Sequence, residues 1–203
     1  RAKEGEYVLV KLEARFEERP LPRVSIIDMR EQLKKGNRLA LSLELREDLS
    51  QCLKKGEQAM LFLNRRGYAG FVSCRSCGHV MKCPHCDVSL SEHNGRKLIC
   101  HYCGYETVKP DKCPVCSSPY IGGFKAGTQQ IQQVVEKEFP EARVLRMDYD
   151  TTRAKGSYEK ILAAFSRHEA DILIGTQMIV KGHDFPDVTL VGILAADLSL
   201  NAD

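Results

Sequence analysis

Hydrophobic positions along most of the chain follow two alternating patterns, short apolar runs and longer segments with helical spacing. The apolar runs predict strands at AMLFLN (59–64), ARVLRMD (142–148), DILIGT (171–176) and VTLVGILAAD (188–197). The helical spacing predicts helices at 39–55 with Gly56 as the terminator, at 127–140 with Thr128 as the N-cap, and at 156–167. Strands alternating with helices of about 12 residues are typical of a parallel sheet covered by helices on both faces. We therefore predict an α/β fold.

The first 36 residues are less regular. YVLVKLEARF (7–16) alternates like a short strand, Pro20 and Pro22 indicate a linker, and VSIIDM (24–29) predicts another strand. The chain begins without an initiator Met and ends directly after an apolar run. We expect it to be a piece of a longer chain.

Residues 70–123 differ in composition from the rest of the chain. They are rich in Cys, Pro, Gly and His and poor in large apolar residues. Because they lie between a predicted strand and the next predicted helix, we expect them to form a small insertion in a loop of the α/β domain.

Eight of the nine cysteines form four Cys-x-x-Cys pairs, namely Cys74/Cys77, Cys83/Cys86, Cys100/Cys103 and Cys113/Cys116. This spacing lets two thiolates from one tight turn bind one tetrahedral ion, so the sequence predicts two closed Cys₄ zinc sites. Gly78 and Gly104 follow two of the pairs, where a positive φ would orient backbone amides toward sulfur. Such closed sites are structural rather than catalytic. Cys52 is expected to be a half-buried free thiol in a helix.

The pairing of the four turns follows from a predicted hairpin. Asn94-Gly95 favours a type I′ turn between strand-like flanks in residues 87–99. Such a hairpin groups Cys83, Cys86, Cys100 and Cys103 in one site and leaves Cys74, Cys77, Cys113 and Cys116 for the other. Tandem and cross-braced pairings remain alternatives. The histidines of this segment are expected on the surface as residues 79, 85, 93 and 101.

Composition narrows the possible classes of protein. Nine cysteines without a secretory signal favour metal binding in a reducing cytoplasm over disulfides, and four pairs in loops argue against a thioredoxin-like redox role. No apolar run of about 20 residues is present to span a membrane. The formal charge of +3 falls to about −1 when eight thiolates bind two Zn²⁺, so net charge does not indicate nucleic-acid binding.

A second candidate site follows the strand at 171–176. Gly175, Thr176 and Gln177 lie at its C-terminal end, where α/β proteins bind ligands. Lys181, Gly182, His183 and Asp184 follow in a short excursion. Together they offer a hydroxyl and backbone N–H groups for a phosphate, a glycine for close approach and a carboxylate. An ordinary strand–loop–strand connection is the alternative.

IGTQMIVKGHDFPDVTLV resembles motif V of superfamily 2 helicases. FLNRRGY, the four Cys-x-x-Cys pairs, FKAGTQQIQQVVEKEFP, RVLRMDYDTT and this motif occur in the order found in the PriA family of bacterial primosomal, replication-restart helicases. The resemblance covers about residues 23–203, and LPRVSIIDMR resembles the exit from that family's first helicase lobe.

This resemblance implies an ATP-dependent 3′→5′ DNA helicase that recognises stalled or abandoned replication forks and initiates primosome assembly. It implies three parts: the tail of lobe 1 and a linker at 1–36, an incomplete RecA-like lobe 2 at 37–69 and 124–203, and a two-zinc insertion at 70–123. Residues expected to contact DNA or couple it to ATP are Gly127, Thr128, Gly175, Thr176, Gln177, Lys181, Gly182 and Asp184.

The implied cofactors are two Zn²⁺ in this chain, with ATP and Mg²⁺ in the full-length protein. The implied partners are forked and single-stranded DNA, single-stranded-DNA-binding protein, and primosome and helicase-loading proteins, in the bacterial cytoplasm at the nucleoid. Arg65, Arg66 and Tyr68 of FLNRRGY are possible DNA contacts, although an exposed Arg pair is more often a solvated loop.

The chain also departs from the family pattern. It contains no G-x-x-x-x-G-K-[ST] phosphate loop and no DExH segment, and it stops before the arginine-bearing motif VI. No catalytic set is complete, so we expect no ATP hydrolysis by this chain itself. The alternative function is a non-catalytic zinc-ribbon module that binds nucleic acid or protein, or whose zinc only shapes a partner surface.

Overall fold

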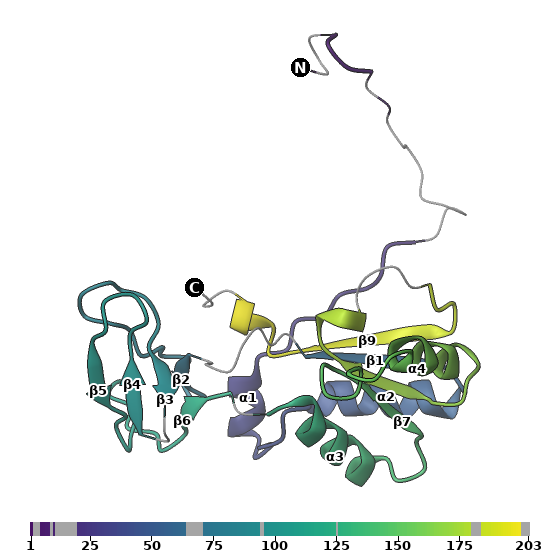
Figure 1. Cartoon of the computed structure of the whole chain (residues 1–203). Coiled ribbons are helices and arrows are strands. Elements are labelled where there is room, and N and C mark those ends of the chain that lie inside the picture. Colours follow the sequence, from purple (N-terminus) through teal and green to yellow (C-terminus); the bar gives the residue numbers. More distant parts are fainter. Residues whose placement is uncertain are drawn as a thin grey trace.

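The computed structural model combines a parallel α/β sheet with a small cysteine-rich module (Figure 1). It describes residues 1, 5–8, 10, 20–63, 71–93, 96–124, 126–179 and 184–199. No helix in these residues is long and apolar enough to cross a membrane. Along the chain, the cysteine-rich module interrupts the α/β part once, between its first strand and its third helix.

Four parallel strands form the main sheet, in the order β7-β8-β1-β9. Their bounds are Val144–Met147 (β7), Ile172–Gly175 (β8), Gln58–Leu63 (β1) and Val188–Leu194 (β9). These are the four predicted strands, and the α/β class is confirmed. At their C-terminal ends Met147, Gly175, Phe62 and Ile193 lie level across the sheet.

Strand alternation divides the α/β core into two layers. Ala59, Leu61 and Leu63 of β1 pack toward α2 (Leu43–Lys54) and α3 (Thr128–Glu138), with Ile131 and Val135 of α3 fully buried. The intervening side chains of β1 pack on the other face with Phe165 of α4 (Ser157–Ser166). Figure 1 shows α2 and α3 on one side of the sheet and α4 on the other. This is the layering that period-2 strands between helices dictate.

Helix starts are set by local hydrogen bonds. The side chain of Ser42 accepts from the backbone N–H of Leu45 at 3.0 Å and caps α2, while Gly56 after its end has a φ of +71°. The predicted N-cap of α3 is wrong by one residue, because Gly127 is the cap and Thr128 is the first helical residue. Thr128 is already helical, and its hydroxyl donates to Asp148, beyond the end of β7.

The predicted strand at 24–29 is wrong. Residues 24–28 have no regular structure, and Asp28 instead caps a short helix, α1 (Met29–Lys34), by accepting from the backbone N–H of Arg30 at 2.9 Å. The side chain of Ile26 is 95% exposed, so it packs against no sheet among the described residues. Of the predicted strand at 7–16, only residues 7, 8 and 10 are described, and none lies in a strand.

The cysteine-rich module has its own two small sheets and its own core. β2 (Val72–Cys74) pairs with β6 (Ile121–Gly123), and β3 (Ser91–His93), β4 (Lys97–Ile99) and β5 (Glu106–Val108) form an antiparallel meander. The predicted hairpin is therefore present, although Asn94 and Gly95 lie outside the described residues. Val72, Leu90 and Leu98 are the main buried aliphatic side chains, beside four buried cysteines.

Two arginines join this module to the segment before α2. Asp28 binds the guanidinium of Arg30, whose Nη1 donates to the carbonyl of Cys77 at 3.5 Å. Arg75 donates from both terminal nitrogens to the carbonyl of Arg38 at 3.4 Å. Both contacts reach the turn that holds Cys74 and Cys77, so that turn is the part of the module anchored to the segment before α2.

Candidate metal centre and ligand edge

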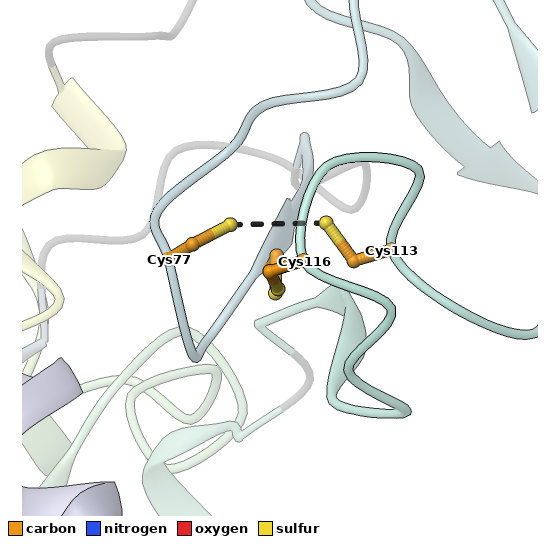
Figure 2. A group of neighbouring side chains, drawn as sticks. Cys77, Cys113 and Cys116 are labelled. Atoms are coloured by element: carbon orange, nitrogen blue, oxygen red, sulfur yellow. Dashed lines mark hydrogen bonds between the residues drawn. The ribbon is translucent and has the colours of Figure 1, made fainter.

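The eight paired cysteines form two compact sulfur clusters. Site 1 contains Cys74, Cys77, Cys113 and Cys116, and site 2 contains Cys83, Cys86, Cys100 and Cys103; all four Sγ atoms of each lie within 4.8 Å of one another. This is the nested arrangement predicted from the hairpin. In site 1 the Cys77 and Cys113 Sγ atoms are 3.7 Å apart, from opposite ends of the module (Figure 2).

The sulfur spacing fits a tetrahedral zinc ion. With a Zn–S bond of about 2.3 Å, tetrahedral geometry separates two sulfurs by about 3.8 Å. The Cys74–Cys116 and Cys83–Cys103 separations are both 3.6 Å, far longer than the roughly 2.0 Å of a disulfide. Four thiolates close the coordination shell, so such an ion has a structural role.

All four Cys-x-x-Cys turns have the same backbone structure. The N–H four residues after the first cysteine donates to that cysteine's carbonyl, as from Gly78 to Cys74 at 2.8 Å. The N–H of the first cysteine donates to the carbonyl five residues on, as from Cys100 to Tyr105 at 2.8 Å. The same two bonds recur in the turns that begin at Cys83 and Cys113. The fold therefore positions each sulfur pair with main-chain bonds alone.

Each turn requires a left-handed residue at its fourth position after the first cysteine. The φ values are +82° at Gly78, +56° at Asp87, +74° at Gly104 and +58° at Ser117. The sequence indicated the two glycines but not Asp87 or Ser117. Asp87 and Ser117 could have been identified from their position, because each lies four residues after the first cysteine of its pair, as the two glycines do.

Backbone amides also act on the thiols. The N–H of Cys103, together with that of Tyr102, lowers the pKa of the Cys100 thiol to about 7 against the effect of burial. Burial raises the pKa of Cys113, but the N–H groups of Cys116 and Val115 outweigh it and bring the value to about 7. A hydrogen bond with Cys103 raises the pKa of Cys86 to about 12. Thiolates this close repel one another, so four can coexist only around a cation.

The positive charges of the module are largely paired with carboxylates. Lys82, Arg96, Lys97 and Lys109 form ion pairs with Asp87, Asp111, Glu106 and Glu92, respectively. The Lys109–Glu92 pair is the least exposed of these, at 2.8 Å. The module's lysines and arginines therefore do not add up to an unopposed basic patch.

A second set of predicted residues lies at the C-terminal edge of the main sheet. Gly175 ends β8, Thr176 follows it, and Gln177 begins a 3-10 turn, η2 (Gln177–Ile179). Gly127 and Thr128 begin α3 beside β7, the neighbouring strand in the sheet. The structure thus brings residues about 50 positions apart in sequence to one edge. Asp184, further along the sequence, is exposed. The predicted residues Lys181, Gly182, Arg65, Arg66 and Tyr68 lie outside the described residues.

Asp148 fixes the start of α3 at this edge. Its carboxylate accepts from the Thr128 hydroxyl and from the backbone N–H of Thr151 at 3.0 Å, and it lies 3.3 Å from Arg146 Nε. Burial raises the pKa of Asp148, but these partners outweigh burial and lower it. No local sequence pattern indicates this carboxylate, because its contact with Thr128 spans 20 residues.

Gly175 has no room for a side chain. A Cβ there would lie 2.5 Å from a methyl group of Ile179 and 2.7 Å from the carbonyl oxygen of Met147. The carbonyl belongs to the backbone of β7 and cannot yield. The glycine therefore permits the tight turn that presents Thr176 and Gln177 at the edge.

Comparisons with known proteins agree on one group of relatives. Residues 83–107, which include all of site 2, match the family model described as "PriA DNA helicase Cys-rich region (CRR) domain". Over 99% of its length the chain is 54% identical to "Replication restart protein PriA" of Bacillus subtilis (strain 168), and over 95% it is 50% identical to the protein of that name in Synechocystis. The Haemophilus influenzae protein is 37% identical over 97% of the chain. The chain spans about a quarter of the length of these relatives.

The nested pairing predicts a characteristic result for double cysteine variants. Replacing Cys77 and Cys113 with Ser removes two ligands of site 1 and should leave one Zn²⁺ per chain. Replacing Cys77 and Cys86 damages both sites and should leave none. Zinc per chain is measured by atomic emission after gel filtration. Equal zinc loss in the two double variants would contradict the nested pairing.

Left-handed turn positions predict opposite effects of glycine and alanine. Gly104→Ala places a Cβ at a φ of +74°, although no atom lies within 4 Å of it, and should cost about 1–2 kcal/mol. Ser117→Gly relieves the same strain and should not lower stability. Chelator concentration at half-release of zinc is the measurement. Stability lost by Ser117→Gly and unchanged by Gly104→Ala would contradict this account of the turns.

Proposed function

The chain belongs to the PriA family of replication restart proteins, and from that premise we propose that it is part of an ATP-dependent 3′→5′ DNA helicase. In this proposal the full-length protein recognises stalled or abandoned forks and initiates primosome assembly in the bacterial cytoplasm, at the nucleoid. Residues 37–69 and 124–203 belong to its second RecA-like lobe, residues 1–36 to the end of the first lobe and a linker, and residues 70–123 to a two-zinc insertion.

The observation that carries this proposal is the meeting of two candidate DNA-contact segments at one sheet edge. Gly127 and Thr128 lie there, at the start of α3. Thr176 and Gln177 come directly after β8, which is the neighbour of β7 in the sheet. Ligands of parallel α/β sheets bind at the carboxyl ends of the strands, and a helix N-terminus favours a phosphate. We assign the DNA backbone to this edge.

The hydroxyl of Thr128 is not the group that meets the phosphate in this proposal. It donates to Asp148, so it has no proton left for a DNA oxygen. The backbone N–H groups of the first turn of α3 and the exposed side chain of Gln177 remain as donors. Lys181, Gly182 and Asp184 follow Gln177 in sequence and are assigned to coupling between DNA and nucleotide.

An exposed apolar face supports the assignment to a lobe of a larger protein. Val191 and Ile193 of the edge strand β9 are 57% and 59% exposed, on the same face as Met60 and Phe62 of β1. Among the described residues, Phe165 of α4 packs in one cluster with Met60 and Phe62 of β1 but not with Val191 or Ile193. Exposed apolar strands at a sheet edge are usually covered in the complete protein. ATP and Mg²⁺ are assigned to the full-length protein.

The zinc ions are assigned a structural role, with the module as a docking platform. Tyr102 and Val115, each inside a Cys-x-x-Cys turn, are 78% and 67% exposed, and the ion pairs described above offset much of the module's positive charge. These features favour contacts with proteins such as single-stranded-DNA-binding protein or primosome and helicase-loading proteins. Forked and single-stranded DNA are assigned to the sheet edge.

The edge assignment predicts how DNA binding responds to Gln177. Gln177→Ala removes an exposed hydrogen-bond donor and should weaken binding to forked and single-stranded DNA about 2–10-fold. The slope of affinity against salt should not change, because the lost group is uncharged. Fluorescence anisotropy over a salt series measures both quantities, with Gln133→Ala in the middle of α3 as the matched control. Affinity equal to that of the unmodified chain would contradict the assignment of Gln177 as a DNA contact at this edge.

A further inference from the structure

Two histidines of the cysteine-rich module lie close together outside both sulfur clusters. The Nε2 atoms of His93 and His101 are 3.1 Å apart, with ring centroids separated by 5.0 Å and planes at 71°. His93 ends β3, and His101 lies inside the turn between Cys100 and Cys103. Neither ring is a member of the two four-cysteine groups.

We propose that His93 and His101 form a third metal site, for a late first-row divalent cation such as Zn²⁺ or Ni²⁺. Metal–imidazole bonds of about 2.0–2.1 Å place two nitrogens of one ion about 2.9 Å apart at a right angle and about 3.3 Å apart in a tetrahedron. The observed 3.1 Å lies between these values. Imidazole nitrogen is a ligand that zinc, nickel and copper prefer.

The backbone holds both ligands in place without the third ion. His93 pairs with Lys97 across β3 and β4. His101 lies in a turn fixed by hydrogen bonds from Cys100 N to Tyr105 O at 2.8 Å and from Gly104 N to Cys100 O at 2.9 Å. That turn also supplies two ligands of site 2. The third site therefore depends on site 2 for its geometry, whereas site 2 has its own four sulfurs.

Access and charge suit an exchangeable cation. His101 is exposed and His93 is half-buried, so an ion can enter from solvent and keep water in its remaining positions. The nearby Lys97 is neutralised by Glu106 at 2.6 Å, and Lys109 is neutralised by Glu92 at 2.8 Å. With two protein ligands instead of four, this site binds more weakly than either sulfur cluster. It acts as a reversible link between β3 and the third Cys-x-x-Cys turn.

The test titrates the untagged chain, holding its two zinc ions, with nickel chloride by isothermal calorimetry. We expect one further ion per chain. His93→Gln and His101→Gln should each weaken that binding at least about tenfold, since even loss of an outer-shell partner costs 10–100-fold. His79→Gln, which removes a histidine of the same module outside the pair, should leave it unchanged.

Zinc content of each variant, measured with a chromogenic chelator, shows whether sites 1 and 2 survive. If His101→Gln releases zinc from site 2, the nickel affinity of His93→Gln is the deciding measurement, because His93 is not adjacent to a cysteine. No further nickel bound by the unmodified chain would overturn the proposal. So would a nickel ion bound equally well by the chain and by His93→Gln. The 3.1 Å contact would then be a hydrogen bond between two rings.

Discussion

The closure of two tetrahedral sulfur clusters is the constraint on which the cysteine-rich module depends. Only a few aliphatic side chains, led by Val72, Leu90 and Leu98, are buried in it, and its strands are three residues long. A segment of this size cannot offset its conformational entropy by hydrophobic burial alone. Metal–thiolate bonds at the two clusters would supply the missing free energy of folding. The nested pairing joins the two ends of the module at site 1, beside the arginines that anchor it to the segment before α2.

The α/β part depends on a different principle, the burial of both faces of a parallel sheet. Its sheet presents Thr176 and Gln177 beside the start of α3, and Asp148 fixes that helix start by a long-range hydrogen bond. In the sequence, the module is inserted between β1 and α3, the helix whose start lies at this edge. The proposed DNA contacts and the proposed docking surface are thus carried by separately stabilised parts of one chain.

Features that depend on local spacing could be predicted from the sequence, whereas features set by contacts between distant residues could not. The four strands and the grouping of the eight cysteines follow from alternation, Cys-x-x-Cys spacing and the hairpin around Asn94-Gly95. The strand expected at 24–29 does not form, because Asp28 caps α1 and Ile26 pairs with no strand among the described residues. Thr128 does not cap α3, because the chain is already helical at this residue and Gly127 is the N-cap. The ion pairs that offset the module's positive charge likewise become visible only in three dimensions.

The most direct test of the metal-dependent fold is a two-dimensional ¹H–¹⁵N spectrum of the chain before and after zinc is removed with a chelator under reducing conditions. After zinc removal, the amides of Val72, Leu90 and Leu98 should lose their dispersion. Amides of Leu61 and Ile174, in the main sheet, should keep theirs. Restoring two zinc ions per chain should restore the spectrum. Dispersed signals from the module without zinc would contradict the claim that metal replaces its hydrophobic core.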